Sequence, residues 1–253
     1  MGFASLPQLA AVTRARVIAG ASFFERYLLS AGYFWLAYRQ GEILQKMALY
    51  SPTDSTGLTP LLGQVANASI LFFVQLCIGA LLLTNKKPVR PPRNLSEIFV
   101  PLFSCLYFVL YSVVPWLPEA LKQNMFRGPV PVSCVLSGFG LGLVGAAFSL
   151  WGVISLGKSF GVFVSVRKVV LHGPYRFVRH PIYLGYCLIW FGLVLINLSP
   201  AVLLLVTGHV FLFRFRARME EKGLLAESPA YKAYSRDTGF LFPRLFGRRE
   251  DRS

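Results

Sequence analysis

The feature that most constrains this chain is a series of six apolar runs. They cover residues 17–38, 61–83, 98–117, 130–156, 181–196 and 200–213. Because the core of a bilayer takes about 20 helical residues, the second, third and fourth runs are each long enough to cross it alone. Hydrophobic residues make up 55% of the 253 positions and charged residues only 15%, a composition typical of membrane proteins. We therefore predict an all-α, polytopic membrane protein of about six transmembrane helices, with a C-terminal helical hairpin and a cytoplasmic tail.

The first run differs from the others because Glu25 and Arg26 lie in its middle. Each charge costs roughly 2.5–3.5 kcal/mol at the centre of an inserted helix. Two interpretations stay open at this point: residues 17–38 cross the membrane, or they form an amphipathic helix at its surface.

The fifth and sixth runs are short, and only the residues from Asn197 to Pro200 join them. This spacing predicts a tight helical hairpin. Residues 211–222 contain no helix breaker before Gly223, so the sixth run is expected to continue as one helix out of the membrane.

The basic residues are distributed unevenly between the connections. Lys and Arg number 21 in the N-terminal arm, in 84–97, in 157–180 and from Arg214 onward, against four in 39–60 and 118–129. Basic loops tend to stay in the cytoplasm, so this split predicts a multi-pass protein with both termini cytoplasmic. The net charge of +15 is explained by topology, and we expect no nucleic-acid partner, since that would require a basic soluble surface with interleaved aromatics.

Neither the cysteines nor the histidines show the spacing of a metal or redox site. The cysteines are Cys77, Cys105, Cys134 and Cys187, and the histidines are His172, His180 and His209. Each cysteine falls singly inside an apolar run and is interpreted as a small buried hydrophobe. We therefore expect no metal.

The fourth run is rich in small residues, with Gly138 and Gly142 in a small-x-x-x-small arrangement and Gly145 one turn further on. Small residues let membrane helices approach closely. This pattern favours helix packing over a ligand-binding role.

The segment 173–185, Gly-Pro-Tyr-Arg-Phe-Val-Arg-His-Pro-Ile-Tyr-Leu-Gly, crowds polar groups against the fifth apolar run. Pro181 lies where a helix would begin, so His180 is expected at the N-cap. Two arginines, a histidine and the N–H groups of a helix start would then meet where lipid contacts water. Such a place suits an anion or a zwitterion.

A second polar group follows on the last apolar helix. His209, Phe213, Arg216 and Glu220 are spaced four, three and four residues apart, so they share one face. One interpretation is a solvated lattice of Arg and Glu side chains at the end of the helix. The other is that this face and the segment 173–185, both on the predicted cytoplasmic side, form two halves of one site.

The ordered motifs of the C-terminal part resemble those of a known family. They are Gly173-Pro174-Tyr175, Arg179-His180-Pro181-x-Tyr183-x-Gly185, Asn197-x-Ser199-Pro200, Arg216-x-x-x-Glu220-Glu221, Tyr231-x-x-Tyr234 and Pro243. Together they resemble the integral-membrane methyltransferases, namely the isoprenylcysteine carboxyl methyltransferase family and the related phospholipid N-methyltransferases. The resemblance covers about residues 155–245. It divides the chain into an N-terminal transmembrane region, 1–150, and a methyltransferase core, 151–253.

The resemblance implies S-adenosylmethionine as methyl donor, with S-adenosylhomocysteine as product. By position, the residues expected to bind the cofactor are Arg179, His180, Tyr183, Gly185, Glu220, Glu221, Gly157 and Gly161. The cofactor's methionine end is a zwitterion, whose carboxylate suits an arginine and whose ammonium suits a glutamate. Arg216 matches the arginine proposed to hold the acceptor carboxylate in the carboxyl methyltransferases.

The expected reaction is direct displacement at the sulfonium methyl, in which the protein aligns the reactants and excludes water. A carboxylate or thiolate acceptor requires no strong base, whereas a protonated amine does, and His180 or Glu220 would then serve as the base. The acceptor is expected to be lipophilic, such as a prenylated carboxylate. The alternatives are a phospholipid amine, a small thiol, or a non-catalytic membrane scaffold or transporter. Apart from the bilayer and this substrate, the sequence indicates no partner or oligomeric state.

Overall fold

The computed structural model describes residues 20–21, 23–49, 55–86, 88, 90, 92–107, 110, 114, 116–123, 125, 130–167 and 169–244, with backbone alone at 55–64, 66–67 and 70–71. The predictions for the N-terminal arm and for the chain beyond Arg244, like several basic residues of the charge count, lie outside these residues.

The described part of the chain is mainly helical, as predicted. Its elements are η1 (Phe24–Leu29), α2 (Ser30–Ala48), α3 (Ser55–Thr84), α4 (Ser96–Leu106), α5 (Glu119–Lys122), α6 (Val132–Leu156), η3 (Gly157–Ser159), η4 (Gly173–Arg176), α7 (Pro181–Asn197), α8 (Pro200–Glu227) and α9 (Pro229–Asp237). The described residues contain no strands, only two isolated β-bridges, which join Arg90 to Val166 and Val178 to Gly239.

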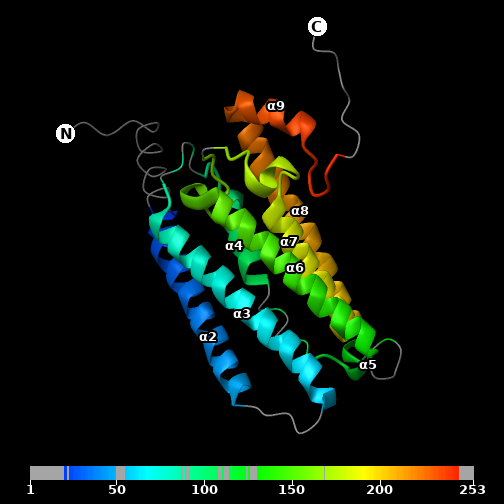
Figure 1. The fold of residues 1–253 in the computed structure, drawn as a ribbon. Coiled ribbons are helices and arrows are strands. Elements are labelled where there is room, and N and C mark those ends of the chain that lie inside the picture. The colour runs from blue at the N-terminus through cyan, green and yellow to red at the C-terminus, as the bar shows by residue number, and fades with distance from the viewer. Residues whose placement is uncertain are drawn as a thin grey trace, which may run out of the picture.

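The long helices run roughly side by side (Figure 1). Helix α3 packs along α2 and α6, and α6 packs along α7, which in turn contacts α8. The start of α2, the C-terminal end of α8 and the short helix α9 lie at the same end of the molecule, and α5 lies at the other (Figure 1). We call these the α9 end and the α5 end.

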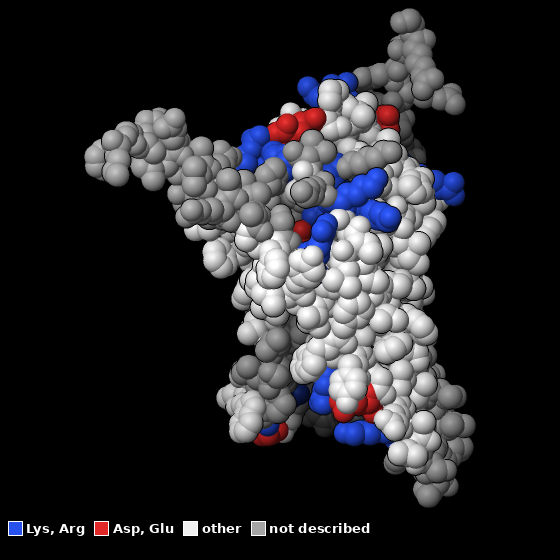
Figure 2. Space-filling model, turned by 90° about the vertical axis from the view of Figure 1, so that its left-hand side faces the viewer, with Lys and Arg blue, Asp and Glu red and all other residues white. Residues whose placement is uncertain are grey.

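The surface has the charge distribution of a membrane protein. Figure 2 shows charged side chains gathered toward both ends, with a broad uncharged band between them. Large apolar side chains are exposed on this body, including Trp35, Phe103, Leu204 and Phe211, as is expected for surface that faces lipid. Two of the described helices, Val132–Ser159 and Pro200–Glu227, are long and apolar enough to cross a membrane by length and composition.

The third apolar run differs from the prediction. Residues 98–117 were expected to be long enough to span alone, but the α-helix there covers only Ser96–Leu106, and the described residues after it are in short 3-10 turns. The residues that follow include three valines and Pro115, which are poor helix formers.

The first run forms a helix that continues to Ala48, well past the predicted boundary. This helix lies lengthwise along α3 (Figure 1). Glu25 does not face the lipid, because its side chain is buried inside the protein.

The predicted helical hairpin is confirmed. Helices α7 and α8 are joined by two residues, and the first of them, Leu198, has a left-handed backbone with φ of 46°. Helix α8 continues as predicted and extends through Gly223 to Glu227. A Cβ atom at Gly223 would lie 2.5 Å from a guanidinium nitrogen of Arg90, so close packing explains the glycine in this helix.

The packing role of the glycines in α6 is confirmed. A Cβ atom at Gly138 would lie 2.6 Å from the carbonyl oxygen of Gly192, and one at Gly145 would lie 2.5 Å from that of Gly185. The small residues therefore bring the backbones of α6 and α7 together, which holds the start of α7 in place.

Candidate functional site

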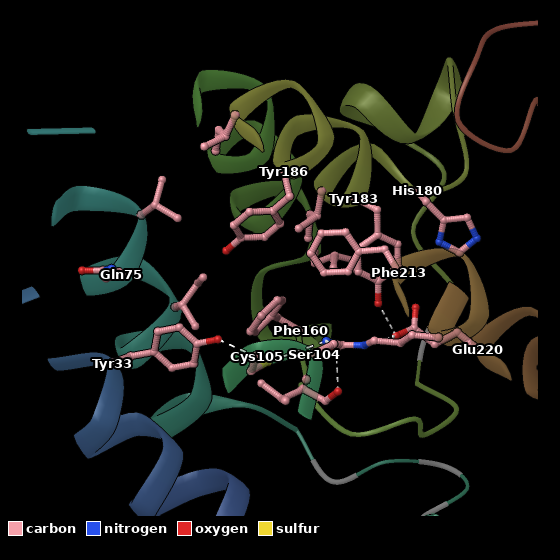
Figure 3. Close-up of a pocket in the computed structure, with 18 of the residues that line it drawn as sticks. Tyr33, Gln75, Ser104, Cys105, Phe160, His180, Tyr183, Tyr186, Phe213 and Glu220 are labelled. Carbon is pink, nitrogen blue, oxygen red and sulfur yellow. Dashed lines mark hydrogen bonds and ion pairs between the residues drawn. The ribbon is translucent and has the colours of Figure 1, made fainter. Parts of the chain in front are cut away.

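A cavity of about 680 Å³ lies inside the helical body and is lined from nearly every long element. Figure 3 shows Tyr33 and Gln75 on one side of it, Ser104 and Cys105 from α4 below, and His180, Tyr183 and Glu220 on the other side. Its walls are mostly apolar, with a few polar groups that converge, which is the usual character of a cofactor or small-molecule site.

Glu221 is the centre of the polar group nearest the α9 end. Its Oε1 lies 2.5 Å from Nε of Arg179 and 3.0 Å from Nε2 of His180, and it accepts a hydrogen bond of 3.3 Å from the hydroxyl of Tyr231. These partners come from the segment before α7 and from α9, so Glu221 joins three parts of the chain.

Residues 239–240 hold the segment before α7 against this group. The backbone N–H of Arg179 donates to the carbonyl oxygen of Gly239 at 2.9 Å, and that of His180 donates to Phe240 at 3.2 Å. The guanidinium of Arg179 also donates to the carbonyl oxygens of Ser235 and Thr238. The orientation of the Arg179 guanidinium is therefore fixed by Glu221 on one side and by these carbonyl oxygens on the other.

His180 occupies the N-cap position of α7, as predicted, but its side chain makes no capping hydrogen bond. The imidazole instead contacts Glu221 and lies 4.7 Å from the ring of Phe240, between ring centres. The backbone of His180 therefore marks the start of α7, and its side chain is part of the site.

Glu220 is the centre of a second polar group, one helical step away. Its Oε1 accepts hydrogen bonds from the hydroxyl of Tyr183 at 2.5 Å and from Nε of Arg216 at 3.1 Å (Figure 3). Adjacent glutamates on α8 thus serve different partners, because neighbouring helical residues point in different directions.

Arg216 is buried and bound on several sides. Its Nη1 donates to Oγ of Ser104 at 2.9 Å and approaches Sγ of Cys105 at 3.7 Å, and its Nη2 donates to the carbonyl oxygen of Val162 at 2.6 Å. With the bond to Glu220, these contacts use four of the five N–H groups of a guanidinium.

The phenols of α9 are neutral donors. Burial raises the pKa of Tyr234 to about 12, and burial together with the nearby Glu221 carboxylate raises the pKa of Tyr231 above its ordinary value. Both hydroxyls therefore keep their protons at physiological pH. Tyr231 uses its proton to bind Glu221, and Tyr234 donates to the carbonyl oxygen of Tyr175.

The structure brings most of the predicted site residues together. Arg179, His180, Tyr183, Arg216, Glu220 and Gly161 line the cavity, and Glu221 binds two of them.

Two predicted cofactor residues lie in other surroundings. Gly185 is buried on the face of α7 that packs against Ser149 and Gly145 of α6. Gly157 ends α6 with φ of 49°, a conformation that favours glycine. The contacts of both glycines are therefore those of packing and chain turning.

Several polar residues of the site were missed by sequence reasoning. Ser104 and Cys105 come from an apolar run, and the hydroxyl of Tyr33 lies 3.6 Å from the sulfur of Cys105. No motif marks them. Glu25 also contacts this region, and its signal was visible as a charge in the middle of an apolar run.

Among the described residues, no group of three or more His, Cys, Asp and Glu side chains could hold a metal ion. Residues 133–229 match the family model described as phospholipid methyltransferase. A comparison with curated proteins finds no match.

Proposed function

Over residues 133–229 the chain belongs to the phospholipid methyltransferase family of integral-membrane methyltransferases, and from this premise we propose that it transfers a methyl group from S-adenosylmethionine to a lipophilic acceptor. The observation that carries the proposal is the convergence of Arg179, His180 and Tyr231 on Glu221, beside the cavity.

The residues present fit this cofactor. Its methionine end carries one positive and one negative charge. The α9 end of the cavity is lined by the Glu220 carboxylate and the Arg179 guanidinium, and Glu221 lies next to it as the partner of Arg179. The start of α7 adds backbone N–H groups that favour an anion. The cavity volume of about 680 Å³ lies within the range of sites for molecules of this size.

When bound, the cofactor would supply an electrophilic sulfonium methyl group. The protein's own contribution would be to bind, orient and exclude water. Arg179 and Glu221 would hold the charged end of the donor, and the apolar walls built by α2, α3, α6 and α7 would keep water away from the reacting atoms. No covalent bond to the protein is needed.

The two classes of acceptor make different demands on the site. A carboxylate would require Arg216 to give up one of its present partners, or to use the one N–H group beyond the four that bind protein atoms. An amine that arrives protonated would require a base, and Glu220 or His180 would accept its proton. The description of the matched family, phospholipid methyltransferase, favours an amine of a lipid headgroup.

The proposal includes six membrane crossings with cytoplasmic termini, and as partners the bilayer and a lipophilic or prenylated substrate. The 21-to-4 distribution of basic residues supports this topology. So does the location of the start of α2 and of α9 at the same end of the molecule (Figure 1).

Cofactor binding is tested by calorimetry with S-adenosylhomocysteine and purified protein. His180→Ala and Glu220→Ala are expected to weaken binding roughly 10- to 100-fold, as for lost hydrogen bonds to a charged group. Arg93→Ala is the control, because its guanidinium pairs with Glu227 near the surface. Equal affinities for all three variants would contradict the assignment.

The acceptor class is tested by incubating membranes that contain the protein with cofactor labelled in its methyl group. Label that is released by mild base identifies a methyl ester, whereas label that resists base identifies an N- or S-methyl product. Transport of a solute down a gradient without cofactor binding would favour the transporter alternative.

A further inference from the structure

Glu25 is an acidic residue whose side chain is buried inside the protein. It lies in the π-helical turn η1, and its side chain is only 6% exposed. A buried carboxylate is strongly destabilising unless its oxygens are hydrogen-bonded and its charge is paired. Turns of π-helix are rare and often occur at functional sites.

The partners of Glu25 all come from the segment after α6. Its Oε1 accepts hydrogen bonds from the backbone N–H groups of Val162 at 2.6 Å and Phe163 at 3.0 Å. Its Oε2 lies 2.8 Å from Nη2 of Arg167. The carboxylate is thus fully satisfied, and it fixes the position of a peptide more than 130 residues away in sequence.

The peptide unit that joins Val162 to Phe163 connects this carboxylate to Arg216. Its N–H group, which belongs to Phe163, donates to Glu25, and its carbonyl oxygen, which belongs to Val162, accepts the hydrogen bond from Nη2 of Arg216 at 2.6 Å. Both residues are buried, so this planar unit has little room to rotate. The direction of the carbonyl that binds Arg216 therefore depends on the hydrogen bond that Glu25 makes at the opposite edge of the same peptide unit.

Gly161 makes this arrangement sterically possible. A Cβ atom there would lie 2.6 Å from a guanidinium nitrogen of Arg167, so any side chain would displace the partner of Glu25. Arg167 also donates to the carbonyl oxygen of Lys86 at 2.7 Å. This contact gives a structural reason for glycine at position 161, which was predicted to bind the cofactor.

We propose that Glu25 is a positioning residue that orients Arg216 in the acceptor site through the peptide unit that joins Val162 to Phe163. The inference rests on the proposed methyltransferase function. It makes the first helix, which lies outside the family match at 133–229, a working part of the site.

The test is a double-mutant cycle on methyl transfer by the full-length protein, with rates normalised to the fraction that binds S-adenosylhomocysteine. Glu25→Leu is expected to lower kcat/KM for the acceptor at least tenfold, while the affinity for S-adenosylhomocysteine changes less than twofold. Glu25→Gln retains an oxygen that can accept the two N–H groups, and it is expected to keep most of the activity. On an Arg216→Lys background, Glu25→Leu should reduce kcat/KM less than twofold further.

The matched control is Arg26→Gln. Arg26 lies in the same π-helical turn, but its guanidinium binds the carbonyl oxygen and side chain of Asn85, so wild-type kcat/KM is expected. The proposal is overturned if the Glu25 and Arg216 effects multiply independently, or if the loss of cofactor-binding protein accounts for the whole decrease.

A stability cycle separates this inference from the proposed function. Wild-type protein that neither transfers methyl groups nor binds S-adenosylhomocysteine would refute the function. The melting temperatures of Glu25→Leu, Arg216→Lys and the double variant would still test the link. Coupling predicts a combined decrease smaller than the sum of the two, and a strictly additive decrease would overturn it.

Discussion

At the scale of single residues, two adjacent glutamates bind different sets of polar side chains in the site. Glu221 binds Arg179, His180 and Tyr231, whereas Glu220 binds Tyr183 and Arg216. The first group suits the zwitterionic end of the proposed cofactor, and in the second group Arg216 also binds Ser104. Under the proposed function, Arg179 and Glu221 of the first group would hold the methyl donor, and Arg216 of the second group would meet a carboxylate acceptor.

The central role of Glu221 predicts the effect of removing its charge. Glu221→Gln keeps the size of the side chain but weakens its attraction for an ammonium group. The affinity for S-adenosylhomocysteine should decrease roughly 10- to 100-fold, measured by calorimetry. Glu227, at the end of the same helix, pairs with Arg93 near the surface. The Glu227→Gln variant should therefore bind S-adenosylhomocysteine as the wild type does. A normal affinity in Glu221→Gln would remove this residue from the donor site.

Tyr231→Phe tests the support that α9 gives to Glu221. The hydroxyl keeps its proton because the pKa of Tyr231 is raised by burial and by Glu221, so it acts as a donor throughout the physiological pH range. Losing this one hydrogen bond should weaken binding of S-adenosylhomocysteine about 2- to 10-fold. The effect should stay the same between pH 6 and 8, and a strong pH dependence there would argue against a neutral phenol.

The pairings of the first cluster were predictable in part from the sequence. The order of the motifs predicted that Arg179 and His180 would meet the double glutamate, and the helical spacing placed Arg216 and Glu220 on one face. The partners Ser104 and Val162 could not be predicted, because they reach Arg216 from 112 and 54 residues away in sequence. Such contacts depend on tertiary packing, which leaves no local pattern.

At the scale of helices, the contact between α6 and α7 determines where the site is built. Glycines on both helices let the backbones touch, and α7 begins with the residues that bind Glu220 and Glu221. A displacement of α7 would therefore move the site as a whole. The spacing of Gly138 and Gly142 predicted this packing, because small residues in membrane helices commonly allow two helices to approach closely.

Substitutions in α6 test this packing with an internal control. A side chain at Gly145 would collide with the backbone of Gly185, whereas a Cβ atom at Gly140 would meet nothing within 4 Å. Gly145→Leu should lower the apparent melting temperature by about 5 °C or more, the size expected for overpacking. Gly140→Ala should leave it unchanged or raise it slightly. Equal melting temperatures for the two variants would contradict the packing role.

The third apolar run shows where hydrophobicity alone misleads. Residues 98–117 have the length of a spanning helix, yet the α-helix ends at Leu106. Ser104 and Cys105 come from its last turn and contact Arg216. An apolar run therefore predicts helix length poorly, because β-branched residues and proline have a low helix propensity and yet do not lower the hydrophobicity of the run.

At the scale of the whole molecule, contacts cross the boundary that the sequence suggested at residue 150. Glu25 binds Val162, and the backbones of Arg90 and Val166 pair with each other. Residues from α2 and α3 also line the cavity. The division into a membrane region and a catalytic core remains a prediction. The cavity is lined by residues from both parts.

The proposed topology is tested by labelling introduced cysteines with a membrane-impermeant maleimide. The background carries alanine at the four native cysteines, and the probes are Lys232→Cys on α9 and Glu119→Cys on α5, both at exposed positions. In right-side-out vesicles, only Glu119→Cys should react before the membrane is opened. Labelling of Lys232→Cys from outside would reverse the orientation, and labelling of both would contradict an intact crossing between them.

The most direct test of the central claim measures methyl transfer by the purified protein in lipid vesicles supplied with a membrane extract as the source of acceptor. Labelled methyl groups from S-adenosylmethionine should accumulate with time in the solvent-extractable fraction. S-adenosylhomocysteine should inhibit this transfer, and Glu221→Gln should reduce it strongly at low cofactor concentration. Label no higher than in protein-free vesicles, with folded wild-type protein that also fails to bind S-adenosylhomocysteine, would contradict the claim that this cavity is a methyltransferase site.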